Sequence, residues 1–200
     1  MTNRTTPAEL LVLQATRTLG HATAARLAER AGLTPAETEE HLLDAEARGW
    51  AAYTGFGGDN GWSLTESGIR HGEGLLAAEL DAAGARTEVE QVYRDFLPLN
   101  DQVAAACTAW QLTEMSIGAQ RVTLSATITA LDRHARVLAR LESRLTARLP
   151  RFTGYHHRFT AALHRATSDP KWITGTDRDS CHRVWFELHE DLLATLQLSR

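Results

Sequence analysis

The glycines of this 200-residue chain are unevenly distributed, which limits where turns and strands can form. Beyond residue 84 glycine occurs only at Gly118, Gly154 and Gly175, whereas eight glycines lie between residues 49 and 74. Glycine is common in turns and hairpins and weakens the interior of a helix. Turns and any strands are therefore expected before residue 75, and the chain beyond that point is expected to be helical.

Two helices are predicted near the start of the chain. Pro7 can begin the first, because proline is tolerated at the first helical position, and leucines give this helix an apolar face up to Gly20. Small apolar residues at helical spacing mark the second helix over residues 24–31. Gly32 is its expected C-terminal stop.

A third helix is predicted to follow and to end before Gly49. Thr34 is the expected N-cap and Pro35 the first helical residue, while Glu37 stands at the capping-box position. The residues expected on the inward face of this helix are Leu42, Leu43 and Ala47.

The glycine-rich stretch itself predicts a β-hairpin. Residues 50–54 have strand character, residues 55–61 are expected to be a turn too flexible for regular structure, and residues 62–64 can return as a second strand. Thr65 would then cap a further helix, entered at about Ile69.

Residues 6 to 80 resemble the winged helix of MarR- and PadR-like bacterial regulators. A small-residue helix, the turn AGLTPAE, a leucine-rich helix ending in RGW and a wing that returns as LTESG follow one another in the order of that family. The resemblance implies a transcriptional regulator that binds double-stranded DNA through a winged helix-turn-helix in residues 1–80. Regulators of this form commonly act as homodimers that contact two half-sites. The small number of cysteines predicts a cytoplasmic location.

The remaining residues, 81–200, predict an all-helical dimerisation or effector domain. One helix is expected to end near Pro98 and another to begin at residues 99–101, with a break at residues 116–120. A long helix is expected over residues 121–149 and a final one through Val184 to Leu196, with Trp172 in a loop between helices. The predicted fold class is mainly α: an N-terminal winged helix-turn-helix with one small β-hairpin, followed by an all-helical C-terminal domain.

The third helix is where a winged helix would read the major groove, and it is poor in hydrogen-bond donors. It is rich in carboxylates, which the DNA phosphates repel. Through residue 80 there are 6 basic and 11 acidic residues, a net charge of -5. The candidate DNA contacts are Thr34, Thr38, His41, Arg48 and Asn60. The alternative is a winged helix that does not bind DNA and serves as a protein-interaction module or accessory subunit.

Basic residues gather later in the chain. Between residues 121 and 165 there are nine arginines and two acidic residues, a net charge of +7. Five arginines spaced three or four residues apart predict a stripe along the long helix: Arg133, Arg136, Arg140, Arg144 and Arg148. This arginine stripe could be a solvated face, a surface that docks the acidic third helix, a contact for DNA phosphates, or an anion site.

Other features carry weaker functional hypotheses. Four residues among the helices could line a small-molecule effector pocket, although such residues are more often core: Trp110, Arg121, Tyr155 and Trp185. Four leucines recur every seven residues, a period that fits either a homodimer or a helix buried in its own domain: Leu124, Leu131, Leu138 and Leu145.

No motif predicts an enzyme, a cofactor or a metal site. The segment WFELHEDLL is interpreted as a polar helix face rather than as acid–base machinery. Cys107 and Cys181 are too few for a disulfide scaffold and are expected to be free and buried. The whole chain has a net charge of -4, and no apolar run approaches the roughly 20 residues of a membrane span, so no membrane partner is expected.

Overall fold

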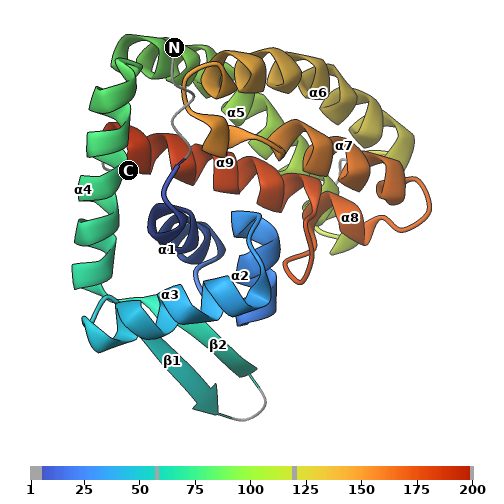
Figure 1. Ribbon diagram of the computed structural model, residues 1–200. Helices are drawn as coiled ribbons and strands as arrows, with labels where there is room; N and C mark the ends of the chain where they lie inside the picture. Colours follow the sequence, from blue (N-terminus) through green and yellow to red (C-terminus); the bar gives the residue numbers. More distant parts are fainter. Residues whose placement is uncertain (1–5, 57–58, 119–120, 199–200) are drawn as a thin grey trace. The chain divides into compact units, whose positions relative to one another are not determined.

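The computed structural model describes residues 6–56, 59–118 and 121–198. The fold is mainly helical, with a small two-stranded antiparallel sheet (Figure 1). The chain divides into two compact units, here called unit 1 (Met1–Gly84 with Leu193–Arg200) and unit 2 (Ala85–Leu192). The sequence predicts a domain boundary at residue 80 and places all later residues in the second domain.

Unit 1 begins with three helices, α1 (Ala8–Leu19), α2 (Ala24–Ala31) and α3 (Pro35–Ala47). Their starts and ends match the local signals in the sequence. Gly32 closes α2 in the left-handed conformation with φ of +68°, which glycine adopts without steric cost. Thr34 caps α3, and the predicted capping box is confirmed.

The inward face of α3 differs in part from the prediction. Leu42 is fully buried in a core that also contains Val12 and Leu27, whereas the Leu43 side chain is 53% exposed. Ala47 is exposed as well. Successive residues on a helix point about 100° apart, so Leu42 and Leu43 cannot both face the same neighbour.

The β-hairpin consists of β1 (Ala51–Phe56) and β2 (Asp59–Leu64). The two strands pair in antiparallel register from Ala51↔Leu64 to Phe56↔Asp59, so the prediction of irregular structure over residues 55–61 is wrong at its ends. Glycine suits position 61 of β2 because the His21 side chain lies close to it. A Cβ atom there would lie 2.7 Å from Nε2 of His21. Residues 57 and 58 of the predicted turn lie outside the described residues.

Helix α4 (Glu66–Ala83) follows the hairpin and begins three residues earlier than predicted. The hydroxyl of Thr65 accepts a hydrogen bond from the backbone N–H of Gly68 at 3.1 Å, which makes Thr65 the N-cap. A second apolar cluster of unit 1 joins Leu10 and Leu76 to Ala194 near the C-terminal end of the chain.

Helices are the regular secondary structure of unit 2 over its described residues. Its elements are α5 (Arg86–Glu114), α6 (Leu124–Thr146), a 3-10 turn η1 (Pro150–Phe152), α7 (Tyr155–Ala166), α8 (Lys171–Thr174) and α9 (Cys181–Leu196), the last turn of which belongs to unit 1. The predicted loop at Trp172 is wrong, since this residue lies in α8.

Helix α5 continues through Pro98, so the predicted break there is also wrong. Proline has no N–H and removes one hydrogen bond from the helix interior. Phe96 before it and Val103 after it are both fully buried, and α5 packs against α6. Tertiary packing therefore outweighs the local preference for a break. The end of α5 at Glu114 agrees with the predicted break before the long helix.

The regularly spaced leucines of α6 pack inside unit 2. Leu131, Leu138 and Leu145 are at most 2% exposed, and Leu124 is half-buried. Helix α6 packs against α5 and α7, which cover this face. The seven-residue period is thus accounted for by the core of the unit. Within the described part of the chain, the helices are all too short or too polar to cross a bilayer.

Candidate functional site

The candidate DNA contacts on α3 lie in different environments. Thr34 is occupied as the N-cap: its hydroxyl lies 3.2 Å from the backbone N of Glu37 and 2.6 Å from the Glu37 carboxylate. The Glu37 carboxylate accepts hydrogen bonds from the hydroxyl and the backbone N–H of Thr34, and these hold the pKa of Glu37 below its usual value. Thr38 is fully buried, and its hydroxyl has no hydrogen-bond partner among the described atoms.

The other three candidates are all more accessible than Thr38. His41 is half-buried and Arg48 is exposed, and both line a cavity. Asn60 is exposed on β2, opposite Gly55 in the ladder. The period of the helix places Thr38, His41 and Ala45 toward α1, so most of the candidates on α3 lie on or near its inner side.

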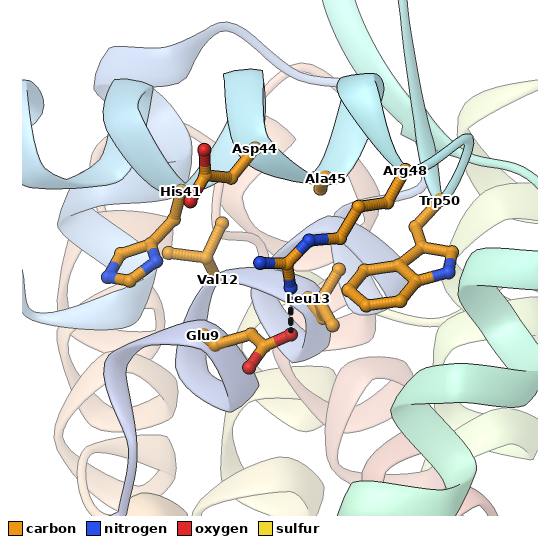
Figure 2. Close-up of a pocket in the computed structure, with 8 residues that line it drawn as sticks. All are labelled: Glu9, Val12, Leu13, His41, Asp44, Ala45, Arg48 and Trp50. Atoms are coloured by element: carbon orange, nitrogen blue, oxygen red, sulfur yellow. Dashed lines mark ion pairs between the residues drawn. The ribbon is translucent and has the colours of Figure 1, made fainter.

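The cavity lies between α1 and α3 in unit 1 and has a volume of about 220 Å³ (Figure 2). Three of its lining residues are apolar and come from both helices: Val12, Leu13 and Ala45. The others are charged, titratable or aromatic: Glu9, His41, Asp44, Arg48 and Trp50. The cavity therefore combines an apolar surface with charges of both signs.

The Glu9 carboxylate contacts two side chains beside this cavity. It lies 3.8 Å from Nη1 of Arg48 and 3.0 Å from Nε2 of His71, a residue of α4. The Trp50 ring contacts the same two residues: the guanidinium of Arg48 lies 5.0 Å from its centroid, and the His71 ring stacks on it at 3.6 Å. Sequence reasoning missed Glu9, Trp50 and His71, because they come from separate elements and share no local motif.

Two polar side chains of the cavity lack such partners. Among the residues that the structure describes, neither the His41 ring nor the Asp44 carboxylate forms a hydrogen bond or ion pair. Figure 2 shows them on one side of the cavity, with Arg48 and Trp50 on the other. No three His, Cys, Asp or Glu side chains in the described ranges are grouped so as to hold a metal ion.

The outward face of α3 carries one leucine among small and acidic residues. Its central residues follow a spacing of four, three and four and are all exposed: Ala36, Glu40, Leu43 and Ala47. Glu39 and Glu46 are exposed beside them. The hairpin residues 51–64 contain no lysine or arginine in the sequence. The exposed surface of α3 therefore presents carboxylates around Leu43.

The arginine stripe of α6 is partly neutralised within unit 2. Arg144 is half-buried, and its guanidinium donates to Glu88 and Asp95 of α5, each at 2.6 Å. The Arg144 guanidinium holds the pKa of Asp95 below its usual value, and Gln91 adds to this effect. The other members of the stripe, all exposed, are Arg133, Arg136, Arg140 and Arg148, of which Arg136 pairs with Asp132 at 3.4 Å.

The residues of the predicted effector pocket lie in different environments. Trp185 is 2% exposed and stacks on Phe96 at 5.1 Å, as a core residue does. Trp110 is 8% exposed. Arg121 is exposed and donates to the backbone carbonyl of Thr113 at 2.8 Å. The Tyr155 hydroxyl is buried and donates to Asp191 at 2.9 Å.

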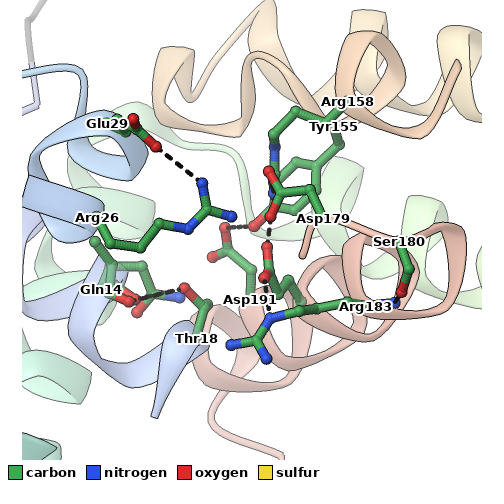
Figure 3. Close-up of polar contacts among 12 residues, drawn as sticks. Gln14, Thr18, Arg26, Glu29, Tyr155, Arg158, Asp179, Ser180, Arg183 and Asp191 are labelled. Atoms are coloured by element: carbon green, nitrogen blue, oxygen red, sulfur yellow. Dashed lines mark hydrogen bonds and ion pairs between the residues drawn. The ribbon is translucent and has the colours of Figure 1, made fainter. Parts of the chain in front are cut away.

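The segment WFELHEDLL is not a polar surface, contrary to the prediction. Glu187 and Asp191 on α9 are 0% and 3% exposed, and both take part in ion pairs. Figure 3 shows Asp191 in contact with Tyr155. Arg158 lies 2.7 Å from the Glu187 carboxylate, and the Asp191 carboxylate accepts from Arg151 and Tyr155. Buried carboxylates need such partners, because the desolvation cost of an unpaired charge is several kcal/mol. These contacts indicate a structural role in unit 2.

Comparison of the chain with protein-family models, curated proteins and solved structures found no significant match.

Proposed function

We propose that unit 1 is a winged helix and that the chain is a regulatory protein that acts through protein contacts. The order of elements supports the winged helix: three helices, a short connection between α2 and α3, a β-hairpin and a further helix. Winged helices serve both as DNA readers and as interaction modules, so the choice between these functions rests on the surface of α3.

The single observation that carries the proposal is the outward face of α3. Leu43 is 53% exposed at its centre, and Glu39, Glu40 and Glu46 surround it. Carboxylates at this position would be repelled by DNA phosphates. An exposed leucine between small residues instead fits an apolar side chain of a partner protein, with basic residues of that partner beside the glutamates.

A DNA-binding regulator is the second candidate function. It is favoured by the four exposed arginines of the stripe, three on α6 and Arg148 just beyond its end, since arginine and lysine supply the phosphate contacts of DNA-binding proteins. In this alternative unit 2 rather than α3 would supply the affinity. A homodimer remains a prediction under both candidates, and light scattering that gives a mass near 22.0 kDa would contradict it.

The experiment that separates the two functions is a titration of the full chain with a labelled random-sequence DNA duplex over a series of salt concentrations. An interaction module is expected to show no binding even at low salt. A DNA-binding protein shows a log affinity that falls linearly with log salt, in proportion to the phosphates contacted. Such a slope, reduced in an Arg136→Glu/Arg140→Glu variant, would overturn the proposal in favour of the second candidate.

Photo-crosslinking from position 43 tests whether the outward face of α3 contacts a partner protein. A photo-crosslinking residue placed there is expected to capture a discrete partner in cells, and the same residue at position 70 on α4 serves as the exposed control. The adduct at position 43 should be lost when Glu39 and Glu46 are changed to lysine. An adduct of equal yield from both positions, or none from position 43, would contradict the contact.

A further inference from the structure

Two exposed surfaces of the chain carry unpaired charges of opposite sign. On the outward face of α3, the carboxylates of Glu39, Glu40 and Glu46 form no hydrogen bond or ion pair with another described residue. On α6 the same holds for the guanidinium groups of Arg133 and Arg140. All five side chains are exposed, so each surface is open to a partner of the opposite charge.

Three of the exposed residues of α3 form a row along the helix. Glu39, Leu43 and Glu46 are separated by four and three residues, so at 1.5 Å per residue the last two lie about 6 Å and about 10.5 Å along the axis from Glu39. At 100° per residue the three lie within about 60° of one another around the axis. The row therefore consists of an exposed leucine with a carboxylate on either side.

The arginines of α6 form a row with the same spacing in the opposite direction. Counted from Arg140, Arg136 and Arg133 lie about 6 Å and about 10.5 Å along the axis, and the three also lie within about 60° of one another. An antiparallel contact between the two helices therefore matches the rows residue for residue. It brings Glu39 to Arg140 and Glu46 to Arg133.

The same register brings Leu43 to Arg136 at the centre of the contact. The Arg136 guanidinium already pairs with Asp132, at 3.4 Å. Arginine can cover apolar surface with its methylene groups while its charged end stays elsewhere. The central contact is therefore apolar, and the two contacts beside it are ion pairs.

We propose that the outward face of α3 docks on Arg133, Arg136 and Arg140 of a second copy of this chain. This inference rests on the proposed function, because it identifies the protein that contacts the outward face of α3. The contact joins two different surfaces, so association can continue beyond two chains unless the contacts are reciprocal. Exposed ion pairs are individually weak and are screened by salt, so the association is weak and sensitive to salt.

The test is sedimentation equilibrium of the full chain from about 10 μM to about 1 mM, the range of weak complexes. It is carried out at about 0.01 M and about 1 M salt, where the Debye length is about 30 Å and about 3 Å. At low salt the weight-average mass is expected to rise with concentration. At high salt it should stay constant.

Two charge-reversed variants assign the association to these surfaces. Arg133→Glu/Arg140→Glu and Glu39→Lys/Glu46→Lys are each expected to abolish the rise in mass, because each places like charges opposite one another. An equimolar mixture of the two should restore it. In the mixture the two reversed surfaces complement each other, and so do the two unchanged ones. Loss of association through misfolding would not be reversed by mixing.

A single variant controls for net charge. Arg140→Glu is expected to weaken the association by about tenfold, since a carboxylate would then face Glu39. Arg70→Glu changes the net charge equally and should leave the association unchanged, because Arg70 lies on α4 and pairs only loosely with Glu66, at 3.9 Å. Equal effects of the two variants would attribute the association to net charge and overturn the proposal.

Two further results would overturn it. One is a mass at low salt that does not change with concentration, and the other is a mixture of the reversed variants that associates no more than each alone. If the crosslinker at position 43 captures a different protein while the purified chain does not associate, the partner is not a second copy and the proposed function stands. If position 43 captures nothing, the proposed function and this inference both fail.

Discussion

The backbone carbonyl oxygen of Trp50 lies 1.9 Å from the position that a Cβ atom would take on Gly68. That oxygen also accepts a hydrogen bond from the backbone N–H of Thr65 at 3.0 Å, so the start of β1 and the first turn of α4 are in direct backbone contact. The side chains of Thr65 and Ser67 both donate to the carbonyl oxygen of Gly49, each at 2.7 Å. This junction leaves no room for a side chain at position 68.

Gly68→Ala is therefore expected to destabilise unit 1. Overpacking of a tight contact costs about 1–3 kcal/mol, and a backbone oxygen cannot move aside as a flexible side chain can. Gly74→Ala is the matched control on the same helix, because a Cβ there meets no atom within 4 Å. The control is expected to stabilise the helix by roughly 0.5–1 kcal/mol. Urea unfolding of both variants measures the difference, and equal effects would contradict the close contact.

Substitution of the buried Asp191 of unit 2 is expected to lower the stability more than Gly68→Ala does. Asp191→Asn removes the charge that faces Arg151, whose side chain is 2% exposed. Breaking a buried pair on one side costs about 3–5 kcal/mol, because it leaves the other charge uncompensated. Arg136→Gln is the control, since its pair with Asp132 is exposed and such pairs contribute about 0–1 kcal/mol. Chemical denaturation should rank the two variants in this order, and a loss for Asp191→Asn as small as that of the control would argue against a buried pair.

Two histidines predict how the stability of unit 2 depends on pH. Burial lowers the pKa of both His134 and His182, and Arg133 adds to the effect at His134. As the pH falls below the usual histidine pKa of about 6.5, the unfolded chain takes up protons that the folded chain does not. Stability should therefore decrease as the pH is lowered through this region, until the lowered pKa values of the folded state are reached.

The variant His134→Leu isolates this effect. Its stability should fall less between about pH 7.5 and about pH 5.5 than that of the wild type, because one of the two protonation sites is gone. His157→Gln, at an exposed position on α7, should keep the wild-type dependence. Denaturation at the two pH values measures this, and an unchanged slope in His134→Leu would show that His134 is not involved.

The two cysteines are predicted to be unreactive in the folded protein. Both are free and buried, which confirms the prediction made from their number. Burial raises the pKa of Cys107 to about 12 and also raises the pKa of Cys181. The thiolate is the reactive form, so a disulfide reagent should label neither thiol in buffer and both in guanidinium chloride. Rapid labelling of native protein would contradict the burial of that cysteine.

The ends of the N-terminal helices were predictable because their signals are local. Thr34 and Glu37 form their capping box within one turn of chain, and Gly32 supplies the left-handed residue that ends α2. The error at Pro98 has the opposite origin. A local rule predicted a break there, but the burial of Phe96 and Val103 in the core of unit 2 keeps α5 continuous.

The candidate site was only partly accessible to sequence reasoning. Arg48 was a predicted contact on the third helix, and the helical period relates it to Asp44. The period does not say which side of α3 faces α1, and Leu43 was placed inward for that reason. Glu9 and His71 come from α1 and α4, and only tertiary packing brings them to Trp50.

The contact of Ala194 with Leu10 and Leu76 also bears on synthesis of the chain by the ribosome. The first 84 residues emerge long before Ala194, so one side of Leu10 and Leu76 lacks its native cover while unit 2 is being translated. Unit 1 completes its apolar cluster only once the end of α9 has left the exit tunnel. Folding of the first segment of the chain is therefore tied to the arrival of its last helix.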